Sequence, residues 1–268
     1  MKKRLGRMET QFLAYLQMRK IRLVKAGEIL KPLGLTRLQE VELYRRMTRG
    51  RLIARVRPGL YLVPERLPLG GAWTPTEIEA LSALIEDRNG SYQLCGPSVF
   101  NRYGYDEQIP NRTYAYNNRI SGDRTVGSIE LTLIKVSDNR LGGTVAITSS
   151  TREHPQYPTR ERALLDAVYD WARFDTLPRA FQWIRSDLNK QLIDPEKLVR
   201  IILEFGDVSS RRRFGYFLER EQCEQRLLLK LERSLAKTTS LIPFIPKRNK
   251  RGKAVPRWGV VDNEMNIQ

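Results

Sequence analysis

The hydrophobic pattern changes its period abruptly between Thr36 and Val63, and this change constrains the fold more than any other feature of the sequence. Thr36 can cap a helix that ends at Gly50, a suitable residue just past a helix C-terminus. After Gly50 the apolar residues alternate, and Pro58-Gly59 fills the central positions of a type II turn before the chain returns through 60–63. A helix followed directly by a two-stranded hairpin is therefore predicted. The inward stripe predicted for the helix is Leu38, Val41 and Tyr44.

Two further helices are predicted ahead of this pair of elements. Residues 8–18 place apolar side chains at helical spacing, and residues 24–30 form a second segment that Pro32 and Gly34 end. The order helix, helix, helix, hairpin is typical of a winged helix-turn-helix. We expect such a domain in residues 1–70.

The basic residues are concentrated at the two ends of the chain, which has a net charge of +17. Residues 1–70 contain 17 basic and 5 acidic side chains, residues 71–245 contain 24 and 23, and the tail 246–268 contains 6 and 2. A basic end joined to a nearly neutral body suggests one module for a polyanion and another module for a different partner.

Double-stranded DNA is the expected polyanion, because a helix fits the major groove. Arg37 and Gln39, near the start of the third helix, are the candidates for contact with base edges. The candidates for contact with phosphates, or with a minor groove under the wing, are Arg45, Arg46, Arg49, Arg55 and Arg57. Two other interpretations stay open: a solvated face of a small helical domain, and a winged helix that binds protein.

The remaining residues, 71–268, predict a larger α+β domain behind a Pro- and Gly-rich linker at 64–71. Thr74 is the predicted cap of a helix that extends to about residue 88, with Pro75 at its first position and Glu77 completing a capping box. Residues 91–148 predict mostly strands, with 129–136 the clearest. The later helices are predicted at about 159–172, 177–189, 195–205, 210–221 and 224–236. Short terminal strands are expected at 241–246 and 258–261.

Several short motifs, in their order along the chain, resemble the AbiEi family of antitoxins and transcriptional regulators of type IV toxin–antitoxin systems. They are Arg57-Pro58-Gly59-Leu60-Tyr61, Thr74-Pro75, Thr159-Arg160-Glu161-Arg162-Ala163-Leu164-Leu165-Asp166, Arg213-Phe214-Gly215-Tyr216-Phe217-Leu218-Glu219 and Arg257-Trp258-Gly259-Val260. The resemblance implies a winged helix that represses its own operon at inverted repeats. It also implies a C-terminal antitoxin domain that counters a nucleotidyltransferase-type toxin without a stable complex.

Two more groups of basic residues are secondary nucleic-acid candidates. Arg211, Arg212 and Arg213 lie at a helix start, where the helix dipole disfavours cations. The tail contributes Lys247, Arg248, Lys250, Arg251 and Lys253. For both groups the alternative is a solvated or structurally paired set of charges.

Enzymatic activity is not expected, and neither a cofactor nor a bound metal is predicted. The phosphate loop, the dinucleotide fingerprint, the zinc-protease motif and the nucleophile elbow are all missing from the sequence, and His154 is its one histidine. Glu161, Asp166 and Asp170 are interpreted as ion-pair partners of nearby arginines. The alternative functions are a nuclease-like enzyme and an RNA-binding protein that stacks bases on tyrosines. The tyrosines in question are Tyr92, Tyr103, Tyr105, Tyr114 and Tyr116.

The sequence also predicts a cytoplasmic protein that does not associate with a membrane. Cys95 and Cys223 are too few for a disulfide framework. Neither a membrane-spanning apolar run nor a secretory signal is recognisable.

Overall fold

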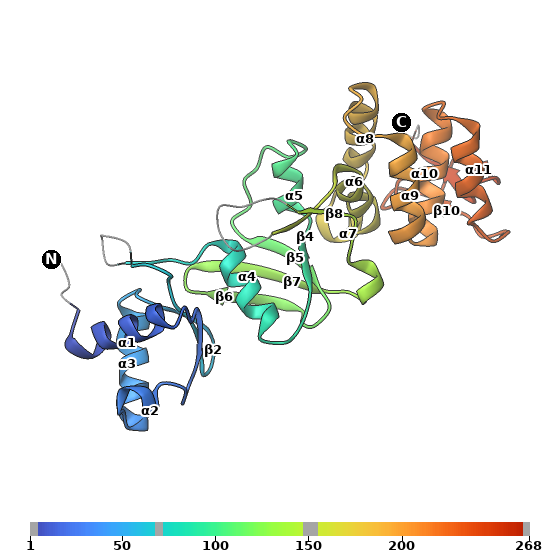
Figure 1. The fold of residues 1–268 in the computed structure, drawn as a ribbon. Helices are drawn as coiled ribbons and strands as arrows, with labels where there is room; N and C mark the ends of the chain where they lie inside the picture. The colour runs from blue at the N-terminus through green and yellow to red at the C-terminus, as the bar shows by residue number, and fades with distance from the viewer. Residues whose placement is uncertain (1–4, 68–71, 147–154, 265–268) are drawn as a thin grey trace. The chain divides into compact units, whose positions relative to one another are not determined.

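The protein has an α+β fold, as predicted, in a computed structural model that describes residues 5–67, 72–146 and 155–264 (Figure 1). His154 lies outside the described residues. The chain forms two compact units and passes between them more than once. Unit 1 comprises Met1–Tyr92, Asn111–Ser137 and Thr148–Pro155, and unit 2 comprises Gln93–Pro110, Asp138–Ile147 and Gln156–Gln268.

The first part of unit 1, here called the N-terminal body, contains three helices and a three-stranded antiparallel sheet with the strand order β1-β3-β2. Its elements are α1 (Arg7–Met18), β1 (Leu23–Lys25), α2 (Leu30–Leu33), α3 (Arg37–Arg49), β2 (Ala54–Arg57) and β3 (Leu60–Leu62). The predicted turn at Pro58-Gly59 joins β2 to β3, and Gly59 has the positive φ of 74° that a type II turn requires. Phe12, Leu16 and Leu43 lie at the centre of the body's core.

The predicted helix at 24–30 is wrong. Residues 23–25 form strand β1, whose Val24 is buried, and α2 begins only at Leu30. The strand exists because Leu23, Val24 and Lys25 pair with β3, a partner that is distant in sequence. Gly27, with a φ of 96°, then separates the strand from the helix.

The second part of unit 1 is a helix packed on a mixed sheet. α4 (Glu77–Glu86) begins with a capping box of Thr76 and Glu79, two residues later than the predicted capping box of Thr74 and Glu77. It lies along the sheet in Figure 1. The sheet has the order β4-β5-β7-β6, with β5 and β7 parallel and β6 antiparallel to β7. Its strands are β5 (Thr113–Asn117), β6 (Gly122–Val126), β7 (Ile129–Lys135) and the edge strand β4 (Tyr92–Leu94), whose last two residues are assigned to unit 2.

The two parts of unit 1 are tied together, which differs from the boundary at residue 70 that composition predicts. Arg57 on β2 forms a two-bond ion pair with Asp87. Arg22 pairs with Glu79 of α4 at 2.5 Å, and the Trp73 N–H donates to the Arg51 carbonyl at 2.7 Å. Residues distant in sequence make these contacts, so local composition does not reveal them.

Unit 2 is mainly helical and carries two small sheets. Its helices are α5 (Pro97–Arg102), the 3-10 helix η1 (Asp138–Arg140), α6 (Arg160–Tyr169), α7 (Trp171–Phe174), α8 (Arg179–Asn189), α9 (Pro195–Phe205), α10 (Val208–Arg220) and α11 (Gln225–Arg233). Its strands are β8 (Thr144–Ala146), β9 (Gln156–Pro158), β10 (Ile242–Pro243), β11 (Lys253–Val255) and β12 (Val260–Asp262). The later helices lie close to their predicted positions, whereas α5 is not predicted by the sequence.

The C-terminal sheet, with the order β10-β12-β11, closes the core of unit 2. Trp258, which is 1% exposed, packs directly on Gly215 of α10. A methyl group at position 215 would lie 2.1 Å from Cε3 of Trp258, so only glycine permits this approach.

Candidate nucleic-acid interface

α3 has a buried face and an exposed face, and both differ from the predicted stripe. Leu38 and Val41, which were predicted to point inward, are 82% and 55% exposed. The side chains that α3 buries are Glu40, Leu43, Tyr44 and Met47. The prediction for Leu38 and Val41 is therefore wrong, and the helix is rotated relative to the expected orientation.

A long-range hydrogen bond accounts for this rotation. The Glu40 carboxylate is buried and accepts the Gly27 N–H at 2.8 Å, so this side chain must face inward. Leu43 and Met47, three and seven residues later, share the face of Glu40. The pattern of apolar residues alone could not reveal that a glutamate would hold the inward position.

The outer face of α3 is the set Leu38, Val41, Arg45 and Arg49, which succeed one another at spacings of three and four residues. Arg45 is 64% exposed and pairs weakly with Glu42 at 3.4 Å. Arg49 is also exposed and has no ion pair among the described residues. The outer face thus presents two apolar side chains and two cations to solvent.

The start of α3 holds the two residues predicted to contact bases. Both Arg37 and Gln39 are exposed. Gln39 completes a capping box, since its Oε1 accepts the Thr36 N–H at 2.9 Å while its own N–H donates to Thr36 Oγ1 at 3.3 Å. Its amide oxygen is therefore engaged within the chain, and its amide nitrogen remains as a donor.

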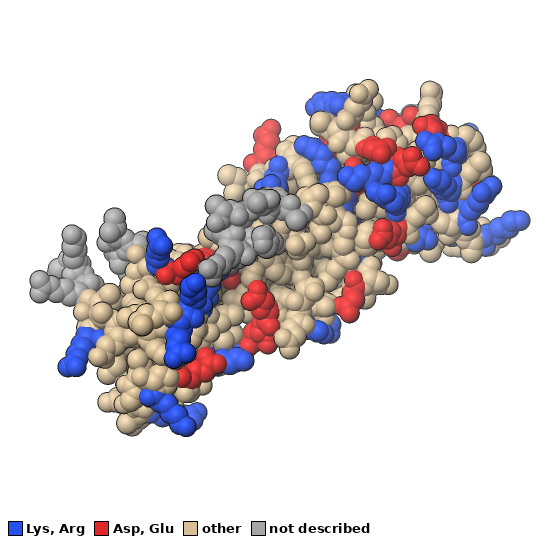
Figure 2. Space-filling view, in the orientation of Figure 1, with Lys and Arg blue, Asp and Glu red and all other residues tan. Residues whose placement is uncertain are grey.

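The remaining predicted DNA contacts lie beside the outer face and on β2. Arg46, 56% exposed, lies 3.5 Å from Glu9 of α1. Arg55 is exposed on β2, but Arg57 donates to Asp87 from Nε at 2.6 Å and from Nη2 at 2.7 Å. These bonds hold the pKa of the Asp87 carboxyl below its usual value. Figure 2 shows basic side chains standing apart from one another on the drawn face of the body.

The three consecutive arginines of α10 contact backbone carbonyls inside unit 2. Arg211 Nη2 donates to the Leu203 carbonyl at 2.7 Å, Arg212 Nη1 to Ser240 at 3.3 Å and Arg213 Nε to Pro243 at 3.4 Å. Arg213 is 6% exposed, and burial lowers the pKa of its guanidinium. This burial contradicts Arg213 as a surface contact to nucleic acid, because α10 turns it toward the C-terminal strands.

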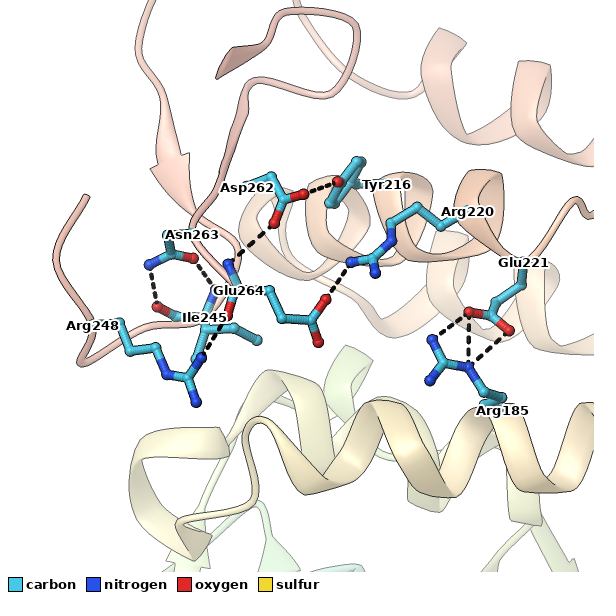
Figure 3. A network of polar contacts seen from close by, with 9 residues as sticks. All are labelled: Arg185, Tyr216, Arg220, Glu221, Ile245, Arg248, Asp262, Asn263 and Glu264. Carbon is cyan, nitrogen blue, oxygen red and sulfur yellow. Dashed lines mark hydrogen bonds and ion pairs between the residues drawn. The ribbon is translucent and has the colours of Figure 1, made fainter. Parts of the chain in front are cut away.

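The basic tail is exposed, and its first two cations are bound to other parts of unit 2. Lys247 pairs with Asp175 at 2.5 Å, and Arg248 Nη1 donates to the Glu264 carbonyl at 3.1 Å (Figure 3). Lys250, Arg251 and Lys253 are exposed. The tail is thus held at its base, while its middle faces solvent.

Figure 3 also shows how α10 holds the C-terminal segment, while Arg185 of α8 donates to Glu221, the residue after α10, at 2.7 Å. Tyr216 donates to Asp262 at 2.6 Å, and burial and this carboxylate raise the pKa of the tyrosine. Arg220 pairs with Glu264. The charged side chains of this network are therefore paired with other groups of unit 2.

The acidic residues of α6 form ion pairs, as the sequence predicts, although their partners differ in part. Asp166 is 1% exposed and accepts from Arg140 at 2.6 Å and from Arg162 at 3.1 Å. Glu161 pairs instead with Lys197 of α9 at 3.3 Å. In the described part of the chain, acidic, histidine and cysteine side chains form no group of three or more that could hold a metal ion.

Four of the five tyrosines considered for base stacking make contacts within the protein, and the fifth, Tyr114, is half-buried. Tyr116 is fully buried, and Tyr105 stacks on Trp183 with ring centroids 5.3 Å apart. Tyr103 donates to the Pro158 carbonyl at 2.7 Å, and Tyr92 lies 2.9 Å from the Ser82 hydroxyl. These contacts favour packing over base stacking.

Comparisons with known proteins show the fold alone. No protein-family model and no curated protein matches this chain. The crystal structure of the RV2827C protein from Mycobacterium tuberculosis is similar, with a TM-score of 0.59 at 16% sequence identity, over 97% of this chain and 93% of that chain. Among the described residues, no helix is both long and apolar enough to cross a membrane.

Proposed function

We propose that the protein is a DNA-binding transcriptional repressor whose N-terminal body acts as a winged helix-turn-helix. The observation that carries this proposal is the outer face of α3. Two cations and two apolar side chains project from one face of a 13-residue helix whose opposite face is anchored in a core. A helix of this kind fits the major groove, where arginine binds guanine and apolar groups contact the thymine methyl.

The other exposed cations have supporting roles in this proposal. Arg37 and Arg46 lie at the sides of the outer face, where a helix in the groove approaches the phosphates. Arg55 is the wing's phosphate contact, while Arg57 remains bound to Asp87. Gln39 acts first as a capping residue, and only its amide nitrogen is available to a base.

We extend the proposal to an antitoxin that regulates its own operon in the cytoplasm. Its support is the sequence resemblance to AbiEi, whose motifs at 159–166, 213–219 and 257–260 all lie in unit 2. The paired toxin would be of the nucleotidyltransferase type, countered without a stable complex.

The test of DNA binding begins with selection of bound sequences from a random duplex library, followed by titration of the selected duplex. The double variant R45A/R49A should lose about thirtyfold or more in affinity, from two lost contacts of about 1–3 kcal/mol each. If these contacts are to phosphates, the slope of log K against log salt shrinks by about 0.9 for each.

The matched control is R124A/K135A, which removes two exposed cations from β6 and β7 of the same unit. Its affinity should stay within about threefold of the parent protein. Equal losses in the two double variants would reject the outer face of α3 as the DNA-binding surface.

The antitoxin part has a separate test, which is co-expression with the product of the neighbouring gene. The intact protein should restore growth without co-purifying with the toxin. If growth arrest persists while the protein still binds DNA, the proposed antitoxin function is rejected and the proposed repressor function is retained.

A further inference from the structure

Unit 2 contains a cavity of about 540 Å³ between the end of α11 and the turn that precedes β12. Its walls include Leu229 and Arg233 of α11, Lys237 in the loop that follows, and Trp258 in the turn. Arg212 of α10 also lines it. The volume lies within the range of roughly 300–1,000 Å³ found for small-molecule sites.

The cations in the cavity wall outnumber the carboxylates that neutralise them. Arg233 and Lys237 are exposed and have no ion pair among the described residues. Arg257 is the exception, since it pairs with Glu219 and with Glu232, the latter at 2.8 Å. The wall therefore has two exposed cations without a carboxylate partner.

Arg212 adds a buried cation to the same wall. It is 9% exposed, and Ser240 supplies its one hydrogen-bond acceptor in the described part of the chain, at 3.3 Å. A guanidinium has five N–H donors, so most of them are not used within the protein. Its flat side packs against Gly259, where a methyl group would lie 3.3 Å from Cζ.

Two motifs that are distant in sequence build this wall together. Glu219, at the end of 213–219, accepts the Trp258 Nε1–H at 2.7 Å and also pairs with Arg257. Gly215 leaves the space that the indole of Trp258 occupies. These contacts fix the turn 256–259 over α10 and hold Arg212 beside Arg233 and Lys237 in one cavity.

We propose that this cavity binds a phosphate group. Arginine and lysine are the side chains that bind phosphate oxygens, and three of them converge here from α10, α11 and the loop after α11. The phosphate belongs either to a free phosphorylated small molecule or to the backbone of a single-stranded nucleic acid.

The experiment measures binding of pyrophosphate to the full chain by calorimetry, with the ionic strength held constant by chloride. The variant R233A/K237A should bind pyrophosphate at least about tenfold more weakly. The control K190A/R200A removes two exposed cations of unit 2 that lie outside the cavity wall, and its affinity should stay within about twofold. R212K, with folding checked by circular dichroism, should also weaken binding.

A single-stranded oligonucleotide, titrated in a second arm, distinguishes the two sources of phosphate. If its affinity falls in R233A/K237A but not in K190A/R200A, the ligand is a nucleic-acid backbone. If only pyrophosphate shows this dependence, the ligand is a small molecule. The proposal is overturned if neither probe binds more weakly to R233A/K237A than to K190A/R200A.

Discussion

Arg55 and Arg57 lie two residues apart on β2, yet their surroundings give them different roles. Arg55 faces solvent, whereas Arg57 donates two hydrogen bonds to Asp87, whose side chain is 5% exposed. A cation bound in this way would have to break an internal ion pair before it contacted a phosphate. Of the two arginines, Arg55 is therefore the better candidate for the proposed contact with DNA.

The first prediction concerns Arg57→Ala, which should lower the melting temperature at neutral pH because it removes two short hydrogen bonds from the buried Asp87 carboxylate and leaves it only the longer contact with Arg88 at 3.4 Å. The hydrogen bonds from Arg57 lower the pKa of Asp87 in the folded state. Their stabilising contribution is complete above the unfolded pKa of about 3.9 and is lost as the pH falls through the folded value.

Thermal unfolding measured from neutral to acidic pH tests whether this stabilisation is lost as the pH falls. The difference between the parent protein and Arg57→Ala should shrink below about pH 4. Arg55→Ala is the control and should leave the melting temperature unchanged. A difference that persists undiminished in acid would contradict the role given to Asp87.

The second prediction separates the two faces of α3. Leu38→Ala, on the outer face, should change the free energy of unfolding by less than about 0.5 kcal/mol. Leu43→Ala, at a fully buried position, should cost about 2–5 kcal/mol. Urea denaturation of both variants measures these values, and similar costs would contradict the orientation of α3.

Leu38→Ala also tests the proposed function, because an apolar side chain can contact the thymine methyl. Affinity for the selected duplex should fall about threefold or more, with little change on random DNA. Replacing thymine with uracil, which removes only the methyl group, should reproduce the loss for the parent protein and add little for Leu38→Ala.

At the scale of elements, α10 and the turn before β12 pack against each other at Gly215. Helix propensity alone favours Gly215→Ala by about 1 kcal/mol. The added methyl group would lie 2.1 Å from the Trp258 ring, and overpacking of a core costs about 1–3 kcal/mol or occasionally more. We therefore predict that Gly215→Ala destabilises the protein.

Ser209→Ala, in the first turn of the same helix, is the matched control because it changes helix propensity without approaching Trp258. Chemical denaturation of both variants compares the two effects. Gly215→Ala should unfold at a lower urea concentration than Ser209→Ala. The reverse order would mean that the turn shifts freely to accept the methyl group.

At the scale of the whole molecule, the division of the chain into two units follows the contacts between residues and not the distribution of charge along the sequence. The basic first seventy residues share unit 1 with α4 and the mixed sheet. A chain that begins at residue 72 would lack Arg57 and Arg22, and would leave Asp87 and Glu79 without those partners. We predict that it folds less stably than the intact protein.

The measurement is urea unfolding of this shortened chain. It is compared with a version of the shortened chain that also carries D87N and E79Q. Neutralising the two carboxylates should recover part of the lost stability, because Glu79 has lost Arg22 and Asp87 keeps only its longer contact with Arg88. An unfolding midpoint equal to that of the intact protein would support two independent modules, as the charge distribution alone suggests.

The sequence by itself determined the elements whose causes are local. Thr36 and Gly50 bound α3, Pro58-Gly59 makes the turn between β2 and β3, and the segment 74–77 marks the start of α4 to within two residues, because caps and turns depend on neighbouring residues. The apolar spacing of α9 to α11 likewise predicted those helices. The positions of the candidate DNA-binding arginines follow from the same local patterns.

Only the tertiary structure decided which of these residues face solvent and are available to bind a ligand. The bond from Gly27 to Glu40 sets the face that α3 turns outward, and the ion pair with Asp87 holds Arg57 on β2 within the protein. Residues 23–25 become a strand only through β3, and Arg212 joins a cavity only because Gly215 admits Trp258. Each outcome depends on a partner that is distant in sequence, and hydrophobic periodicity carries no information about which distant side chains will meet.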